Sequence, residues 1–266
     1  MAADLQESGL PDTLTIIAIT VFAAVLADVL HELVGHGAGC MLSGGRPLLF
    51  STVHFECSVQ TRLLSACGTL VNVIVGVLAL FARRASRSSH WRYFFWLLMV
   101  FNLLDAAGYF LYSGIGNIGD WAYVIHDLHP AWAWRVGLTL IGAATYWWFV
   151  IISLRELQPL LSPNHERRLR LARRYLFIPY FTNGVLLTVA GLFNPVGMFL
   201  VAISAMAASF GGCSGLLWMG SFLHGNQVRP PSTESAPLKK SWSWIATAIP
   251  LAAVFIAVIG RGVKLS

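Results

Sequence analysis

Long apolar segments separated by short polar stretches run along almost the whole chain. Seven of these segments approach or exceed the roughly 20 residues that a helix needs to cross a bilayer core. They cover residues 13–42, 62–82, 92–113, 131–157, 174–193, 196–222 and 243–260. The pattern predicts an all-α polytopic membrane protein with about six to seven transmembrane helices.

One segment after the first apolar run has a different pattern. Residues 48–59, "LLFSTVHFECSV", alternate loosely and are rich in β-branched and aromatic types, and Pro47 hinders a continuing helix just before them. We therefore expect a short β-strand or hairpin beside the membrane. An exposed strand edge of this kind can pair with another extended chain.

Polar side chains inside the apolar segments concentrate in the first half of the chain. This divides the sequence into a membrane core of three helices over residues 1–130, which carries these polar side chains, and additional transmembrane helices over residues 131–266. Residues 225–241, rich in Pro, Ser and polar types, are predicted to form a flexible loop within the second part.

Composition agrees with a membrane environment, since 56% of the residues are hydrophobic and 11% are charged. If the seven segments span, 13 of the 18 Lys and Arg residues fall on one side. The positive-inside rule then places the N-terminus and the loops after the second, fourth and sixth segments in the cytoplasm, with the protein in the cell membrane and in contact with lipid. Basic residues without interleaved base-stacking side chains indicate no nucleic-acid partner.

The four cysteines form no CxxC unit, which excludes a zinc finger by spacing. They are Cys40, Cys57, Cys67 and Cys213. Cys40 and Cys57 flank the first loop and could pair in an oxidising compartment, but we expect single buried thiols.

The stretch "ADVLHELVGHGAGC", residues 27–40, places ionisable groups inside the first apolar segment. Each such group at membrane depth costs about 2.5 to 3.5 kcal/mol on insertion scales, so Asp28, His31, Glu32 and His36 need compensation. A bound dication supplies it. Catalytic zinc takes three protein ligands, commonly imidazole and carboxylate, and leaves a position for water, whose proton a neighbouring glutamate can accept.

The two histidines are five residues apart, one more than in the His-Glu-x-x-His pattern. On a regular helix, His31 and His36 would point about 140° apart and could not share one ion. A π-bulge would bring them nearly into line, and Gly35 has the backbone freedom to allow it. The spacing therefore predicts a departure from α-helical geometry between His31 and His36.

Two aspartates are candidates for the third ligand. Asp105 lies at the same depth as the histidines, whereas Asp120 follows the Gly-rich break "SGIGNIGD". Asp105 could instead be a packing contact with Asn72 or Asn102, and Asp120 could simply cap the next helix. We expect at least one of the two to bind the metal together with His31 and His36.

The segments "HELVGHGAG", the predicted loop strand, "ACGTLVNVIVG" and a third helix with Asn and Asp resemble the intramembrane site-two protease family of zinc metallopeptidases, over roughly residues 14–128. The resemblance implies one zinc per chain held by His31, His36 and an aspartate. It implies Glu32 as the general base and a transmembrane or membrane-associated polypeptide as substrate, presented by the loop strand.

Two features depart from that family. The extra residue in "HELVGH" is similar to the His-Glu-x-x-Gly-His motif of dipeptidyl peptidase III type enzymes, and the family's Leu-Asp-Gly motif is absent, which leaves the third ligand open.

Three other functions fit parts of the sequence. A non-proteolytic metal-binding scaffold or inactive protease relative would keep the same ligands, and a transporter would use them as a buried ion site. A di-iron membrane oxygenase or desaturase would need several more histidine boxes, and "HDLH" at residues 126–129 is the only other histidine cluster in the sequence.

Overall fold

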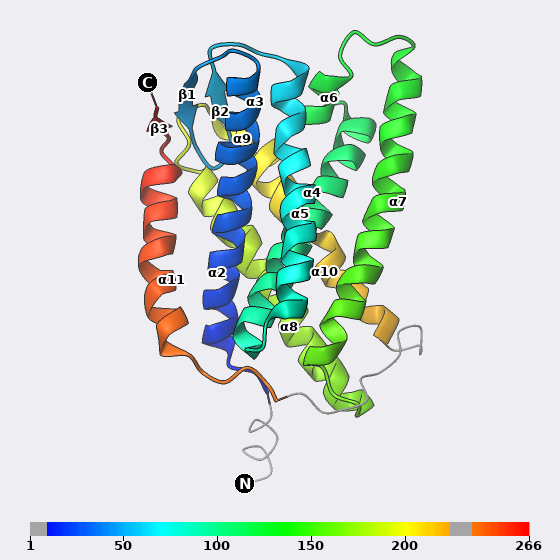
Figure 1. Cartoon of the computed structure of the whole chain (residues 1–266), viewed down its shortest axis with the longest axis vertical. Helices are drawn as coiled ribbons and strands as arrows, with labels where there is room; N and C mark the ends of the chain where they lie inside the picture. The colour runs from blue at the N-terminus through cyan, green and yellow to red at the C-terminus, as the bar shows by residue number, and fades with distance from the viewer. Residues whose placement is uncertain (1–9, 224–235, 266) are drawn as a thin grey trace.

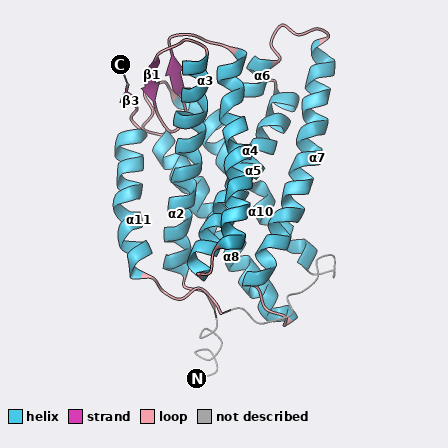
Figure 2. Cartoon of the chain, viewed as in Figure 1, coloured by secondary structure: helices cyan, strands magenta, loops and turns pink. Residues whose placement is uncertain are grey.

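The computed structural model describes residues 10–223 and 236–265. Within them, long helices run side by side as a bundle, and a small sheet caps one end (Figures 1 and 2). Six helices are long and apolar enough to cross a membrane, which confirms the predicted all-α polytopic architecture. They are Thr13–Leu42, Arg62–Ala85, Ser89–Gly116, Ala131–Leu160, Met198–Leu223 and Trp242–Ile259.

Several of these spans contain more than one type of helix. The first consists of α2 (Thr13–Val29), the π-helix η1 (Leu30–His36) and α3 (Gly37–Leu42). The others are α4 (Arg62–Ala85), α5 (Ser89–Gly116), α7 (Ala131–Leu157) with η2 (Gln158–Leu160), α9 to η5 (Met198–Leu223, with the π-helix η3 at Val201–Gly211), and α11 (Trp242–Val254) with η6 (Phe255–Ile259). The short helix α6 (Asp120–Val124) and the long helix α8 (His165–Gly191) complete the fold.

Side-chain caps define where three of the helices begin. Asp12 accepts a hydrogen bond from Thr15 N at 2.9 Å, and the Thr61 hydroxyl accepts one from Leu64 N at 3.1 Å. Asn164 caps α8 in the same way. Each cap satisfies a backbone N–H that the first helical turn leaves without a partner.

Helix α8 contains the predicted segment 174–193 but is not among the six apolar helices. It nevertheless runs between the same two ends of the bundle as its neighbours, and the described part of the chain begins at one end of the bundle and finishes at the other (Figure 1). Its hydropathy is lowered by five Arg residues in its first part and by polar residues further along, such as Asn183, which is buried inside the bundle. A helix of low hydropathy can therefore still belong to the bundle when its polar residues face the protein interior.

Helix α5 is the most buried of the six apolar helices. Its Tyr93 and Trp96 are fully buried, and each satisfies its polar group on a neighbouring helix. Tyr93 donates to Tyr175 O at 3.0 Å, and Trp96 Nε1 donates to Ser153 O at 2.9 Å. The large aromatic rings thus fill the core without leaving an unmatched donor.

The expected hairpin is present and is extended by a third strand. β1 (Pro47–Phe50) pairs antiparallel with β2 (Phe55–Cys57), and β3 (Val263–Lys264) pairs with the other edge of β1, in the order β2-β1-β3. Both edges of β1 are occupied, by β2 and β3. Among the described residues, no strand pairs with the outer edge of β2, so a further strand could add there.

A disulfide joins Cys40, in α3, to Cys57, in β2. The expectation of single thiols is wrong for this pair, although Cys67 and Cys213 are buried free thiols as expected. Gly45 provides the room, since a Cβ there would lie 2.4 Å from Cys57 Sγ. Disulfides persist in oxidising compartments, which agrees with the non-cytoplasmic side predicted for the first loop.

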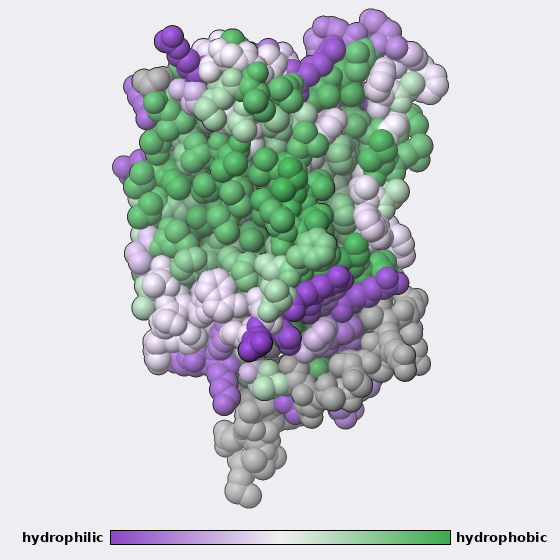
Figure 3. Space-filling view, viewed as in Figure 1, coloured by the Kyte–Doolittle hydropathy of each residue, from purple (hydrophilic) through white to green (hydrophobic). Residues whose placement is uncertain are grey.

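Figure 3 shows an apolar band across the visible face of the bundle, with more polar surfaces toward its two ends, as expected for a multi-pass membrane protein. Residues 225–235 of the predicted flexible loop lie outside the described residues. Its described end is held against the bundle, because Leu238 is buried and its carbonyl accepts a hydrogen bond from Asp12 N at 3.0 Å. Residues of both predicted parts of the chain, from Ile16 to Phe255, contribute to one buried apolar cluster.

Candidate metal centre

The first span changes from α- to π-helix over Leu30–His36, the segment that contains both histidines. The wider turn lets residues five apart face the same side. The imidazole rings of His31 and His36 accordingly lie with their centroids 4.9 Å apart, at 84° to each other. The predicted departure from α-helical geometry is confirmed.

Three buried side chains of this π-helix converge. Ligand atoms of His31, Glu32 and His36 all lie within 4.8 Å of one another and could hold a metal ion. All three side chains are more than nine-tenths buried. Among the described residues, this is the one group of three or more His, Cys, Asp or Glu side chains whose ligand atoms lie this close together.

Gly35 lies within the π-helix and also has a packing role. Its backbone is not in the left-handed region that favours glycine. Instead, a Cβ at Gly35 would lie 2.6 Å from Gly68 Cα in α4, and one at Gly39 would lie 2.7 Å from Leu64 Cα. The glycines four residues apart therefore allow close contact between the two helices, as small residues do in membrane bundles.

Helix α4 also orients one of the histidines. His36 Nδ1 lies 2.9 Å from the carbonyl oxygen of Leu64, so this nitrogen carries the proton and donates it. The other ring nitrogen, Nε2, is then free to act as a ligand. The His31 ring stacks on Tyr109 of α5, with centroids 4.9 Å apart.

Asp120 reaches the histidines from a different part of the chain. α5 ends at Asn117, which is left-handed at φ 54°, and Gly119 at φ 86° turns the chain into α6. Asp120 Oδ2 thereby lies 3.5 Å from His31 Nε2 and 3.4 Å from His36 Nε2. The N-cap position belongs to Gly119, so Asp120 does not have the capping role that was its alternative.

The electrostatics of this contact favour a charged carboxylate. Burial alone would raise the pKa of the Asp120 carboxyl. The opposite charge of His36 and the closeness of both imidazoles outweigh burial and hold the pKa well below its usual range. A carboxylate in this state is the form that binds metals.

Asp105 has different partners. Its Oδ2 accepts a hydrogen bond from Asn72 Nδ2 at 2.9 Å, the packing contact considered for it from the sequence. Asp105 lines a second cavity inside the bundle, which Asp120 does not line. The structure thus brings Asp120, and not Asp105, into contact with both histidines.

A cavity of about 170 Å³ opens beside the histidines. Its walls include Glu32, His36 and Asp120, together with Val53 and His54 from the hairpin turn. The turn is closed by a hydrogen bond from Ser51 N to His54 O at 2.9 Å. His54 is therefore near the site, whereas His126 of the "HDLH" segment is exposed and pairs with Asp127.

Two residues of the site were not singled out for it by sequence reasoning. Gly68 is part of the quoted stretch "ACGTLVNVIVG" without any assigned role, yet a Cβ there would lie 2.7 Å from His31 Nε2 and 2.8 Å from His36 Nε2. Tyr109 had no signal beyond its position one turn after Asp105. Both are recognised only when α4 and α5 are placed against η1.

No protein-family model, curated protein or solved structure matches this chain.

Proposed function

We propose that this protein is a zinc-dependent intramembrane endopeptidase, which cleaves peptide bonds within or beside the membrane. His31, His36 and Asp120 would be the metal ligands and Glu32 the general base. The observation that carries the proposal is the contact of one Asp120 oxygen with the Nε2 atoms of both histidines, at the mouth of a cavity that Glu32 also lines.

The spacing of these atoms fits a zinc ion. Ligands at about 2.0 to 2.1 Å in tetrahedral geometry are separated from one another by about 3.4 Å. The two distances from Asp120 Oδ2 to the imidazoles are 3.5 Å and 3.4 Å. His31 Nε2 and Asp120 Oδ2 are also buried and make no hydrogen bond of ordinary length within the described residues. Two nitrogens and one carboxylate oxygen form a typical catalytic zinc set.

Zinc bound there would lower the pKa of a coordinated water and polarise the peptide carbonyl. Glu32 lies next to His31 in the chain and faces the same cavity. Its carboxylate accepts the proton of the attacking water and returns it to the departing amine, as a general acid-base residue does. His36 keeps its orientation throughout, because Leu64 O holds its Nδ1.

The hairpin gives the substrate a direction of approach. Its turn, with Val53 and His54, forms part of the cavity wall, and β2 leads from that turn with its outer edge open. An extended segment could pair with this edge and place one peptide bond above the metal. A helical segment has its backbone groups already paired, so the substrate would be unwound where it is cut. The resemblance to the site-two protease family supports the same substrate class.

A Glu32→Gln variant tests the proposal. Purified wild-type protein in detergent should contain about one zinc per chain and cleave a transmembrane test substrate in proteoliposomes. The variant should retain zinc and thermal stability while the cleavage rate falls about 10²- to 10⁴-fold. Glu166→Gln is the matched control, since the Glu166 side chain is 84% exposed and far along the chain from the site. Unchanged cleavage by Glu32→Gln would refute the base role.

A metal-binding scaffold is the second candidate, favoured by the closeness of Glu32 to the histidines. If Glu32 joined His31, His36 and Asp120 as a fourth ligand, the site would be closed, as structural zinc sites are. Glu32→Gln would then lose zinc and stability together. Zinc content of this variant therefore separates the two functions.

A further inference from the structure

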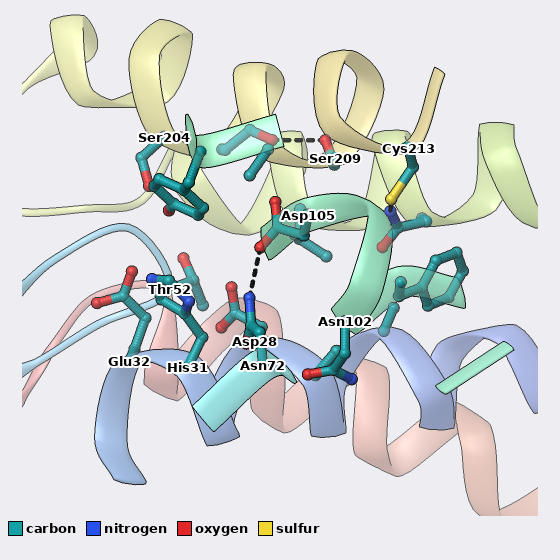
Figure 4. A pocket seen from close by; sticks show the side chains of 18 residues that line it. Asp28, His31, Glu32, Thr52, Asn72, Asn102, Asp105, Ser204, Ser209 and Cys213 are labelled. Carbon is teal, nitrogen blue, oxygen red and sulfur yellow. Dashed lines mark hydrogen bonds between the residues drawn. The ribbon is translucent and has the colours of Figure 1, made fainter. Parts of the chain in front are cut away.

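A second cavity, of about 40 Å³, lies on the other side of His31 in the interior of the bundle (Figure 4). Side chains from α2, α4, α5, α8 and η3 and from the hairpin turn line it. The polar ones are Asp28, His31, Glu32, Thr52, Asn72, Asn102, Asp105, Tyr109, Asn183, Ser204 and Ser209. Such a concentration of polar groups in the membrane-spanning part of a bundle needs a physical reason.

Oxygen atoms in this cavity lack partners. Asp28 Oδ2, Thr52 Oγ1, Asn72 Oδ1 and Asn102 Oδ1 are buried and make no hydrogen bond within the described residues. Asn72 is 1% exposed, Asn102 0% and Thr52 2%. Each unmatched buried polar atom costs about 1 to 3 kcal/mol.

Asn72 and Asn102 each use the amide nitrogen in a hydrogen bond and leave the amide oxygen without a partner. Asn102 Nδ2 donates to Leu98 O at 2.8 Å, and Asn72 Nδ2 donates to Asp105 Oδ2 at 2.9 Å. With the nitrogens engaged, both oxygens can accept a cation or a donor from the cavity. Figure 4 shows Asn72, Asp28 and Asp105 gathered around the same space.

The charge of the cavity is also unbalanced. Three carboxylates line it, those of Asp28, Glu32 and Asp105, whereas His31 is the one basic side chain among its lining residues and none of them is Lys or Arg. Carboxylates in a low-dielectric interior require either protons or a cation. Oxygen donors are the preferred ligands of hard cations, and the unpartnered atoms of this cavity are oxygens. The Cys213 thiol also lines the cavity but is not needed as a ligand.

We propose that this cavity is a second metal site, which binds a hard divalent cation of the calcium type. The carboxylates of Asp28 and Asp105 match the two charges, while Glu32 belongs with the histidine pair. Thr52, Asn72 and Asn102 add neutral oxygens. Ca²⁺ accepts six to eight oxygen ligands in flexible geometry, whereas Mg²⁺ requires a near-ideal octahedron and retains its own waters. Since one water needs about 10 to 15 Å³ of such space, the cavity admits the ion and one or two waters.

The bound cation would tie together α2, α4 and α5, which supply Asp28, Asn72 and Asp105. These helices also position the histidine pair, so the second site would stabilise the framework of the first. The inference does not depend on the proposed peptidase activity, because His31, His36 and Asp120 are not its ligands.

The test measures cation binding on the zinc-loaded wild-type protein in detergent. Equilibrium dialysis with radioactive Ca²⁺ should give one Ca²⁺ per chain, and Tm should rise with CaCl₂ by several degrees but much less with MgCl₂ or with NaCl at equal ionic strength. In Asp28→Asn and Asp105→Asn the Tm response should disappear while one zinc per chain remains. Asp127→Asn, whose side chain is 79% exposed, should respond like the wild type.

Absence of Ca²⁺ binding to the wild type would overturn the proposal, and this result does not depend on the folding of any variant. A response that persists in both aspartate variants would place the ion elsewhere. A response to Na⁺ alone would overturn the divalent assignment. Loss of zinc from Asp105→Asn would show that the two sites are one.

Discussion

Gly68 packs so closely beneath His36 that a β-carbon at position 68 would lie 2.8 Å from the histidine's Nε2 atom. The same carbon would lie 2.7 Å from His31 Nε2. Backbone of α4 thus lies directly against both nitrogens that the proposed metal would bind. Position 68 therefore needs a glycine because of the histidine pair, and not only because of helix packing.

Replacing Gly68 with Ala should displace one or both imidazoles and weaken zinc binding at least tenfold. Overpacking of a closely packed interior costs about 1 to 3 kcal/mol, so thermal stability should also fall. Gly137→Ala is the control, because nothing lies within 4 Å of a Cβ at that position of α7. Chelator competition and thermal unfolding measure the two effects. Wild-type zinc affinity in Gly68→Ala would contradict the close contact.

Asp120→Asn should reduce zinc affinity by more than about 100-fold. Loss of a residue that only supports a ligand already costs about 10- to 100-fold, and loss of a ligand should exceed this. Asp105→Asn should leave zinc affinity unchanged, since Asp105 bonds to Asn72 and not to the histidines. Titration against a chelator of known affinity compares the two variants. The reverse ranking would make Asp105 the third ligand.

The disulfide between Cys40 and Cys57 should stabilise the end of the bundle that contains the site. It links residues 17 apart in the chain. Closure of a loop of about this length stabilises a fold by about 3 kcal/mol in the chain-entropy model. The double replacement Cys40→Ser and Cys57→Ser should therefore lower Tm, and a reducing agent should lower Tm of the wild type but not of the variant. Equal Tm values with and without reductant in the wild type would contradict this.

Glu156 forms a buried ion pair at the opposite end of the bundle. Its carboxylate contacts Arg83, whose side chain is 6% exposed, and also Arg84. Glu156→Gln would leave the Arg83 charge buried without its partner, at a cost of about 3 to 5 kcal/mol. Glu166→Gln removes an exposed pair with Arg170 and should cost less than about 1 kcal/mol. Thermal unfolding measures the loss of stability in both variants. Similar losses would contradict the larger cost expected from leaving the Arg83 charge buried without its partner.

The sequence by itself determined the membrane architecture, the hairpin and the distortion of the first span. Each follows from local rules: apolar length, alternation of β-branched residues, and the five-residue spacing of His31 and His36. The spacing in particular required a wider helical turn, because no regular α-helix can direct both rings to one ion.

The tertiary structure alone decided which aspartate meets the histidines, why Gly35 is a glycine, and which cysteines pair. Depth in the membrane favoured Asp105 and the Gly-rich break favoured Asp120, but only the turn after α5 carries Asp120 back to η1. Gly35 is explained by Gly68, a residue in another helix. These are contacts between distant segments, and their free energy depends on how helices pack, which the local pattern of residues does not specify.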